Sequence, residues 1–362
     1  MRVASQAIFW GGAATTGWVL VGYPAALALL PRRAWVPGQE LPRVSIVIAA
    51  YREREELAEK LRSLDRQDYP ADRLQVIVVV DDDAETARLA RAARPDAVVL
   101  FAAERGGKPA ALNRGIAVAD SPVVVMTDSN NLLAPGSLRA ALRHFADPSI
   151  VAVAGRRGED RSAYDRYEDL IRRLETRTGS VAAMSGEFMA VRRERLAPFP
   201  EDAVVDDLWL LCHLARSGGR AVYEPSAGST EPAIARGAEI ARRSRMSAGR
   251  LQMAADLRGL PWAFRWRVLS HKYGRLALPV LLPTVLLSSL VLSRRMPYRA
   301  AAAVQVAGYA LGAASLAGAT PPRPLATLAR ACGQFMLGNY SVGVGLLRGL
   351  RGAQGIRWDP VR

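Results

Sequence analysis

Two kinds of hydrophobic pattern divide the chain. Between residues 43 and 155, short and nearly continuous apolar runs alternate with stretches whose apolar positions recur every three or four residues. The runs predict strands at 44–50, 74–80, 97–101 and 122–127, and the other stretches predict helices at 57–64, 85–93, 108–118 and 137–145. Strands that are apolar without alternation are buried on both faces. The pattern therefore predicts an α/β domain, with a mostly parallel sheet covered by helices on both faces.

Longer apolar segments lie toward both ends of the chain. Residues 7–30 form an uncharged run of 24, long enough for a helix to cross a hydrocarbon core of about 30 Å. A cleaved signal peptide is the alternative, but its apolar part is usually about 7–15 residues long. Segments 276–293 and 300–319 predict two further spans. Segment 325–347 predicts either a further, polar-lined span or an amphipathic helix lying in the membrane interface.

These patterns predict five consecutive regions. They are a transmembrane anchor (1–33), a cytosolic domain (34–258) entered through a linker, an interfacial helix (259–275), a membrane region (276–347) and a basic tail (348–362). Arg32 and Arg33 follow the first run, and basic residues favour the cytosolic side of a membrane. We therefore expect a multi-pass protein of the inner or plasma membrane, with its main domain in the cytosol.

The net charge of +15 is unevenly distributed along the chain. From residue 261 onward there are 13 basic residues and one acidic residue, so the remainder of the chain is close to neutral. The basic excess therefore borders apolar segments, where it suits contact with membrane lipid. This distribution argues against a nucleic-acid partner.

Acidic residues follow two of the predicted strands. Asp81, Asp82 and Asp83 come after the strand at 74–80, and Asp128 comes after the strand at 122–127. In an open parallel sheet, ligands bind beyond the carboxyl ends of the strands. Carboxylates that converge there suit a divalent cation holding phosphates. The alternative for the triplet is that these acids only cap a helix or form a turn.

A short glycine pair lies between the two acidic clusters. Arg105-Gly106-Gly107-Lys108 opens a predicted helix, where backbone amides can approach a phosphate. The spacing differs from that of a Walker A loop, and a proline follows the lysine. We expect Lys108 to contribute to nucleotide binding.

Eight segments in this order resemble family 2 glycosyltransferases with the GT-A fold, of the membrane-anchored type that includes bacterial poly-N-acetylglucosamine and hyaluronan synthases. The first four are VSIVIAAYRE (44–53), VVVDDDAET (78–86), RGGKPAALNRGIAVA (105–119) and VVVMTDSNNLL (123–133). The later four are YEDLIRRLETRTGS (167–180), SGEFMAVRRE (185–194), VVDDLWLLCHLARSGGRAVYEP (204–225) and RRSRMSAGRLQ (242–252).

The resemblance implies how the donor is bound. Asp82 would contact the base or ribose, and Ala50, Tyr51 and Asp81 would lie nearby. Asp128 stands at the first acid of the DxD motif and would lie beside the diphosphate and its Mg²⁺ or Mn²⁺ ion. Asn130 replaces the second acid, and its amide oxygen could also bind the cation.

The resemblance also implies the groups that carry out transfer. Asp207 stands at the final acid of the family's Glu-Asp pair and would be the general base, with Asp206 in place of the glutamate. The element RRSRM matches the family's QxxRW element, with Met246 in place of tryptophan. Its three basic residues would neutralise the leaving diphosphate, the alternative being a solvated basic helix face; they are Arg242, Arg243 and Arg245.

Three glutamates in the later segments have structural interpretations, and one of them also has a catalytic one. Gly186 and Glu187 would lie on the acceptor side, where Glu187 is either a second catalytic acid or an ion-pair partner of Arg192 or Arg193. Glu168 and Glu175 are expected to be solvated partners of neighbouring arginines.

The sequence therefore predicts a membrane-anchored inverting glycosyltransferase that uses a nucleotide sugar, with a UDP-sugar favoured. The acceptor would be a growing polysaccharide or a lipid-linked sugar extended once. A membrane nucleotidyltransferase and a catalytically weak membrane scaffold are the alternatives from other classes. So few predicted spans suggest a second copy or a partner membrane subunit if a conducting path is needed.

Overall fold

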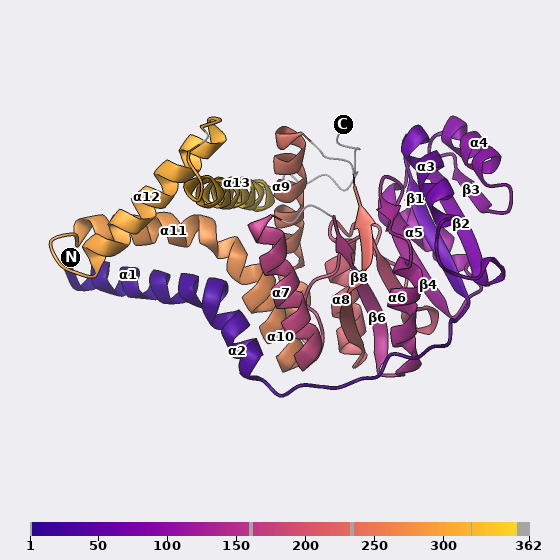
Figure 1. Ribbon diagram of the computed structural model, residues 1–362, viewed down its shortest axis with the longest axis horizontal. Coiled ribbons are helices and arrows are strands. Elements are labelled where there is room, and N and C mark those ends of the chain that lie inside the picture. The colour runs from indigo at the N-terminus through magenta and orange to yellow at the C-terminus, as the bar shows by residue number, and fades with distance from the viewer. Residues whose placement is uncertain (1, 159–161, 232–234, 320, 353–362) are drawn as a thin grey trace.

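The computed structural model describes residues 2–158, 162–231, 235–319 and 321–352 (Figure 1). One part of the molecule is built on a mixed eight-stranded sheet with the order β3-β2-β1-β4-β7-β6-β8-β5. The other part consists of helices from both ends of the chain, which lie together on the left of Figure 1. The predicted α/β sheet with helices is confirmed.

The first half of the sheet is parallel. β1 (Val44–Ala50) lies between β2 (Leu74–Asp81) and β4 (Val123–Asp128), and β2 also pairs with β3 (Val98–Ala102). All four were predicted to within about one residue at each end. The chain runs outward from β1 in both directions, so a crevice opens beyond the carboxyl ends of β1 and β4.

The second half of the sheet is mixed. β7 (Met189–Arg192) pairs antiparallel with both β4 and β6 (Ile150–Arg157), while β8 (Arg220–Thr230) is parallel to β6 and antiparallel to β5 (Leu132–Leu133). The hydrophobic pattern did not predict these strands. β5 and β7 are too short for a periodic signal, and β8 carries a proline and a glycine.

Helices cover both faces of the sheet and bury it. One face packs against α5 (Gly107–Ala117) and α8 (Asp206–Arg216), and the other against α3 (Arg54–Leu64), α4 (Ala84–Ala93) and α6 (Ser137–Leu142). Alternate residues of β1 point to opposite faces, with Val47 in the first core and Ile46 in the second. Burial on both faces explains the unbroken apolar runs of β1, β2 and β4.

Two continuous helical segments are long and apolar enough to cross a membrane among the described residues. They are Arg2–Leu29 and Trp262–Val291, with mean hydropathy 1.2 and 1.7. The first comprises α1 (Arg2–Gly17), a π-helical turn and α2 (Tyr23–Leu29); the second comprises α10 (Trp262–Val268), another π turn and α11 (Gly274–Val291). α1 and α11 lie side by side (Figure 1).

The remaining predicted spans also form helices. Segment 300–319 corresponds to α12 (Tyr298–Leu316), and segment 325–347 to α13 (Leu325–Leu350). Neither is among the two segments that meet the length and hydropathy criteria for a membrane span. Their placement in a membrane stays a prediction. Of the predicted basic tail, residues 353–362 lie outside the described part of the chain.

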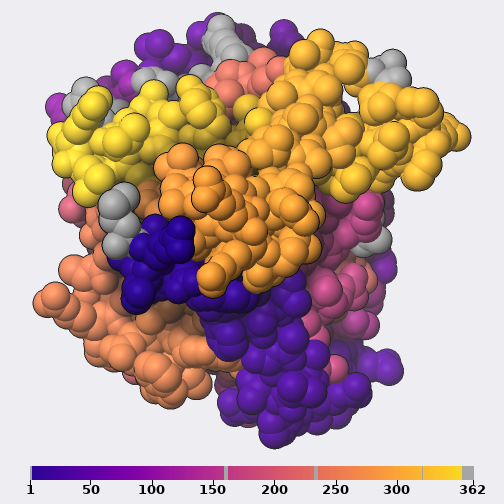
Figure 2. Space-filling model, turned by 90° about the vertical axis from the view of Figure 1, so that its left-hand side faces the viewer, coloured from indigo at the N-terminus to yellow at the C-terminus, as the bar shows by residue number. Residues whose placement is uncertain are grey.

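Large apolar side chains that are exposed to solvent concentrate on these helices. All but six of them lie in residues 2–30 and 262–350. Figure 2 looks onto this part of the molecule, where α1 packs beneath α11 and α12 while α13 lies along one edge. A soluble domain rarely exposes so much contiguous apolar surface, so this face needs an apolar partner.

The predicted linker after the first apolar helix is bonded to the sheet domain. The backbone N–H of Arg33 donates to the carbonyl of Arg177 at 2.8 Å, and that of Gly38 donates to Arg143 at 2.8 Å. The indole of Trp35 donates to Nδ1 of His144 at 2.8 Å. The segment therefore fixes the domain against the helices instead of acting as a flexible connection.

Gly115 is the position where the packing of α5 on the sheet is tightest. A Cβ atom there would lie 2.4 Å from a methyl carbon of Val47 and 3.2 Å from one of Val79. We expect Gly115→Ala to destabilise the protein by about 1–3 kcal/mol, because the overpacked helix must move off β1. Thermal unfolding of the purified chain in detergent measures this. Gly237→Ala is the control, since a Cβ there meets nothing within 4 Å; equal midpoints for the two variants would contradict the packing argument.

Candidate active site

A cavity of about 450 Å³ lies at the carboxyl ends of β1 and β4, and it continues between α7 (Ala163–Thr178), α9 (Arg236–Gln252), α11 and α13. Every residue predicted for the site lines it except Asp82. These residues are Ala50, Tyr51, Asp81, Lys108, Asp128, Asn130, Gly186, Glu187, Asp206, Asp207, Arg242, Arg243 and Arg245. Segments that are up to about two hundred residues apart in the sequence therefore meet at one site.

The acidic triplet after β2 does not act as a single cluster. Asp81 lines the cavity, and its carboxylate accepts hydrogen bonds from the backbone amides of Gly106 (2.9 Å) and Gly107 (2.8 Å). Asp83 pairs with Arg54, whereas Asp82 is exposed and lies outside the cavity lining. The position of Asp82 thus does not support the expectation that it faces the nucleotide. The backbone amides of Gly106 and Gly107, which were expected to bind a phosphate, donate instead to Asp81.

Lys108 joins acids from two different elements. Its ammonium lies 2.7 Å from Oδ1 of Asp128, at the end of β4, and 3.2 Å from Oδ2 of Asp206, at the start of α8. A Cβ on Gly186 would lie 2.8 Å from this ammonium, so the absence of a side chain there leaves room for it. Both carboxylates are therefore held by a single cation.

Asp207 is a buried acid of the site. It stands beside Asp206 in the first turn of α8, and its carboxylate accepts a hydrogen bond from the N–H of Leu208 at 2.7 Å. Burial and the neighbouring charge of Asp206 raise the pKa of Asp207. A carboxylate with a raised pKa is a better proton acceptor at neutral pH, which suits a general base.

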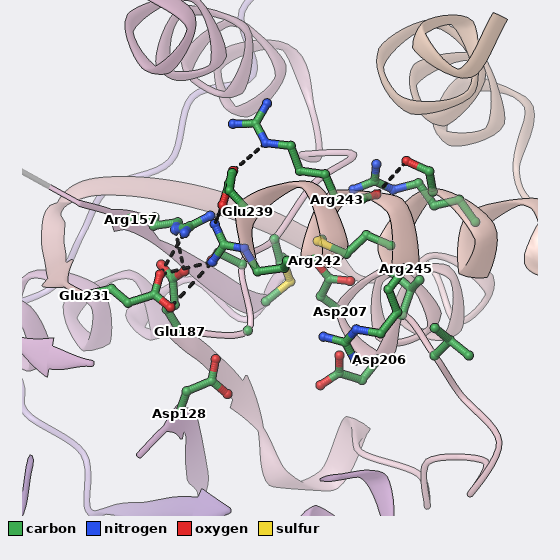
Figure 3. Close-up of a pocket in the computed structure, with 18 of the residues that line it drawn as sticks. Asp128, Arg157, Glu187, Asp206, Asp207, Glu231, Glu239, Arg242, Arg243 and Arg245 are labelled. Atoms are coloured by element: carbon green, nitrogen blue, oxygen red, sulfur yellow. Dashed lines mark hydrogen bonds and ion pairs between the residues drawn. The ribbon is translucent and has the colours of Figure 1, made fainter. Parts of the chain in front are cut away.

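Ion pairs of alternating sign tie α9 to the sheet domain (Figure 3). The ladder runs in the order Glu187, Arg157, Glu231, Arg242, Glu239 and Arg243, and each residue contacts the next. The N–O distances of the first four contacts are 2.7 Å, 2.7 Å, 3.1 Å and 2.6 Å. The partner of Glu187 is therefore Arg157. The predicted partners were wrong, and Arg192 instead donates to backbone carbonyls. Burial raises the pKa of Glu187 to about 7.

Arg245 differs from the other two arginines of the RRSRM element. Arg242 and Arg243 belong to the ladder, whereas Arg245 forms no hydrogen bond or ion pair with any other described residue. Arg245 points toward Asp206 (Figure 3). Burial lowers the pKa of Arg245, and the negative charges of Asp206 and Asp128 partly offset this effect. Arg245 is thus the arginine available for an anionic ligand, and the element is not a solvated helix face.

A buried lysine supports the loop after β4. Nζ of Lys60 donates to Oγ1 of Thr127 (2.8 Å) and to Oδ1 of Asn131 (2.6 Å), and both of these residues also donate to the carbonyl of Glu187. Burial lowers the pKa of Lys60 to about 7. The sequence analysis did not identify this residue. The signal was present, because Lys60 stands on the apolar stripe of α3 between Leu57 and Leu64.

Glu168 and Glu175 on α7 are buried, so the expectation that they are solvated was wrong. Glu175 contacts Nδ1 of His271 at 2.9 Å and accepts from the hydroxyl of Tyr23 at 2.6 Å. Glu168 lies 3.3 Å from Nε2 of the same histidine. Tyr23 and His271 come from helices about 150 residues earlier and 100 residues later, which local spacing along α7 could not reveal. Of the neighbouring arginines predicted as partners, Arg172 lies 3.9 Å from Glu168.

The donor set fits a divalent cation that is shared with a diphosphate. Asp128 offers a carboxylate and Asn130 an amide oxygen at the end of β4, and Mg²⁺ is usually bound by one or two carboxylates together with substrate phosphates. The described residues contain no group of three or more His, Cys, Asp or Glu side chains that could hold a metal on its own. Phosphate oxygens of a bound nucleotide would complete the coordination of a cation held by Asp128 and Asn130.

Comparison with known proteins identifies the class of enzyme. Residues 42–245 match the family described as "Glycosyltransferase like family 2", and these residues make up more than half of the chain. The chain belongs to this family and is a glycosyltransferase. No curated protein sequence matches it.

Solved structures agree with the fold. The mannosyltransferase PcManGT from Pyrobaculum calidifontis, in complex with GDP-Man and Mn²⁺, has a TM-score of 0.74 and 26% identity, covering 98% of this chain and 99% of that one. GalNAc-T7 with UDP, GalNAc and Mn²⁺ has a TM-score of 0.44 and 14% identity, covering 53% and 44%. The first likeness supports the GT-A fold; neither bears out the predicted resemblance to polysaccharide synthases.

The low pKa of Lys60 has a consequence for stability. The folded protein holds Lys60 at a pKa of about 7, below its ordinary value of 10.5, so the unfolded chain binds more protons between these two values. The free energy of unfolding should therefore rise with pH from 7 toward 10.5. In Lys60→Met we expect this rise to be smaller when thermal unfolding is compared at pH 7, 8 and 9.

Arg62→Met serves as the control for this measurement, because Arg62 is exposed two residues further along α3. It should keep the pH dependence of the unchanged chain. An identical pH dependence in Lys60→Met and Arg62→Met would contradict a depressed pKa at Lys60.

Proposed function

We propose that the chain is a membrane-anchored inverting glycosyltransferase that transfers one sugar from a nucleotide sugar to a lipid-linked glycan or a polysaccharide. The observation that carries this proposal is the convergence of Asp128, Asp206 and Asp207 with Lys108 and Arg245 on one cavity. Acids for metal and proton transfer and cations for a diphosphate are then within reach of the same substrate.

The donor occupies the part of the cavity nearest the sheet. Ala50, Tyr51 and Asp81 at the ends of β1 and β2 would contact the nucleoside, and Asp128 and Lys108 would lie beside the diphosphate. A UDP-sugar was favoured from the sequence. The likeness to a mannosyltransferase solved with GDP-Man makes GDP-mannose the first donor to test beside UDP-sugars.

Transfer requires one bond to form as another breaks. The acceptor hydroxyl oxygen attacks the anomeric carbon, its proton passes to Asp207, and the bond from that carbon to the diphosphate oxygen breaks with its electron pair leaving on the nucleotide. Attack opposite the leaving group inverts the anomeric centre. Arg245 and Lys108 then face the negative charge that accumulates on the leaving diphosphate.

Asp128 and Asn130 would hold the divalent cation. When bound, Mg²⁺ or Mn²⁺ supplies further positive charge next to the diphosphate oxygens. The neighbouring mannosyltransferase was solved with Mn²⁺, which supports testing that ion first.

The membrane placement rests on the exposed apolar helices. Arg2–Leu29 and the part of Trp262–Val291 that follows residue 275 would cross the bilayer, with the sheet domain in the cytosol. α13 packs along α9 and carries polar residues toward the cavity, which supports the interfacial alternative for this helix. The predicted regions 1–33, 34–258, 259–275 and 276–347 stand as proposals on this basis.

Asp207→Asn tests the general base. We expect nucleotide-sugar transfer to fall by about 10²–10⁴-fold, because an amide cannot accept the hydroxyl proton, while binding of the nucleotide diphosphate is retained. A panel of GDP-mannose and UDP-sugars with Mn²⁺, read out as released nucleotide diphosphate, identifies the donor and measures turnover.

Asp202→Asn is the matched control for this substitution, since Asp202 is exposed five residues before Asp207. Its turnover should equal that of the unchanged chain. Full activity in Asp207→Asn would remove Asp207 from the mechanism. Inactivity of the unchanged chain toward every donor would contradict the proposed reaction.

Asn130→Asp tests the cation site. Restoring a second carboxylate should tighten Mn²⁺ binding several-fold, because it adds a negative charge beside Asp128. Calorimetric titration of Mn²⁺ in the presence of GDP or UDP measures this. Asp128→Asn should weaken binding in the same assay, and unchanged affinity in both variants would place the cation elsewhere.

A further inference from the structure

Three cations surround one carboxylate at the end of the cavity farthest from the sheet. Lys272 lies 3.6 Å and Arg172 lies 3.9 Å from Oε2 of Glu168, and Arg275 pairs with its Oε1. All four residues line the same cavity as Asp128 and Asp207. Positive charge therefore exceeds negative charge in this cluster, which we call the distal cation cluster.

The nearby carboxylates do not remove this excess. The carboxylate of Glu175 contacts Nδ1 of His271 and accepts hydrogen bonds from the hydroxyl of Tyr23 and the N–H of Ala182. Asp169 lies close enough to Arg172 to influence it, but also accepts from the hydroxyl of Tyr223 at 2.5 Å.

Two donor atoms of the cluster have no hydrogen-bond partner among the described residues. They are Nε of Arg172 and Nη2 of Arg275, and both are buried. The side chains themselves are only 13% and 14% exposed. Leaving buried charged donors unsatisfied is costly, so the cluster is suited to an anion that accepts from them.

The walls next to the cluster are apolar. Leu20 precedes α2, Leu278 lies on α11, and Phe335 and Val342 lie on α13; all four line the cavity. Leu20 and Leu278 belong to the two helical segments long and apolar enough to cross a membrane. An anion that binds here can therefore carry a hydrocarbon chain.

The cluster also adjoins the proposed base. A smaller cavity is lined by Asp207, Arg250 and Lys272 together. The charge of Lys272 acts on Asp207. A group bound to the cluster would thus have its next substituent near the carboxylate that accepts the proton.

We propose that the distal cation cluster binds the phosphate or diphosphate of a lipid-linked acceptor. Arg172, Lys272 and Arg275 hold the phosphate oxygens, the apolar walls hold the lipid, and the acceptor sugar extends toward Asp207. This inference rests on the proposed function, because it names the acceptor that the transferase uses. It favours a lipid carrier over a free polysaccharide.

Binding of farnesyl diphosphate tests the proposal, with the full-length protein in a non-ionic detergent and isothermal titration as the measurement. We expect the unchanged chain to bind it, and Arg172→Gln to weaken binding by about tenfold through loss of a charged donor. Arg173→Gln is the matched control, since Arg173 is the exposed neighbour on the same helix. Unaltered affinity in Arg172→Gln would overturn the proposal.

A second variant addresses the lipid without changing a charge. Val342→Trp should narrow the apolar part of the cavity and weaken the binding of farnesyl diphosphate. The binding of inorganic pyrophosphate should stay the same. If pyrophosphate binds as tightly as farnesyl diphosphate, the cluster takes a free anion and the lipid assignment is wrong. If phosphatidylglycerol vesicles displace farnesyl diphosphate competitively, the cluster binds a membrane headgroup and the acceptor assignment is wrong.

Donor binding separates failure of this inference from failure of the proposed function. GDP or UDP with Mn²⁺ should bind equally to the unchanged chain and to Arg172→Gln, because the donor lies at the other end of the cavity. Donor binding without farnesyl diphosphate binding would overturn the acceptor site alone. Absence of donor binding in the unchanged chain would contradict the transferase mechanism instead.

Discussion

The ammonium group of Lys108 is the contact on which the arrangement of the site depends. It brings Asp128 of the parallel half of the sheet together with Asp206 of α8, which follows the antiparallel strand β7. Without a cation between them, two carboxylates in a partly enclosed cavity would repel each other. The same pair leaves Asp207 more deeply buried behind Asp206, where its proton affinity rises. The two halves of the fold are therefore joined electrostatically at the place where chemistry is proposed.

The parallel half of the sheet was predictable because each strand carries its own signal. β1, β2 and β4 are buried on both faces, so they appear as unbroken apolar runs between helical repeats. The other half has fewer such signals: β6 contains an apolar run at 150–154 that was not predicted as a strand, and the remaining strands lack one. β7 has four residues, and its antiparallel pairing with β4 depends on contacts across more than sixty residues of sequence. Local periodicity carries no information about a pairing of that kind.

Motif resemblance placed nearly all of the predicted residues around one cavity, but it did not give their partners. Asp82 stands next to Asp81 in the sequence, yet only Asp81 points inward, since neighbouring residues at a strand end face different directions. Arg157 was missed because its ion-pair partners, Glu187 and Glu231, are distant in sequence. Lys60 stands on the apolar stripe of α3, but its hydrogen-bond partners after β4 could not be read from that stripe. The glutamates of α7 looked like ordinary surface residues of a charged helix. These glutamates are buried because helices from both ends of the chain pack against α7.

The segment between α2 and β1 has a consequence for how the enzyme meets its acceptor. Hydrogen bonds at Arg33, Trp35 and Gly38 hold it against the sheet domain, and the domain rejoins the helices at α10. Attachment at two points prevents the domain from rotating about a single tether. With the membrane anchoring proposed above, the mouth of the cavity would keep a fixed depth and orientation relative to the lipid. A lipid-linked acceptor would diffuse in two dimensions toward an opening of fixed orientation. The local concentration of the acceptor in the membrane, more than its affinity for the enzyme, would then set how often the two meet.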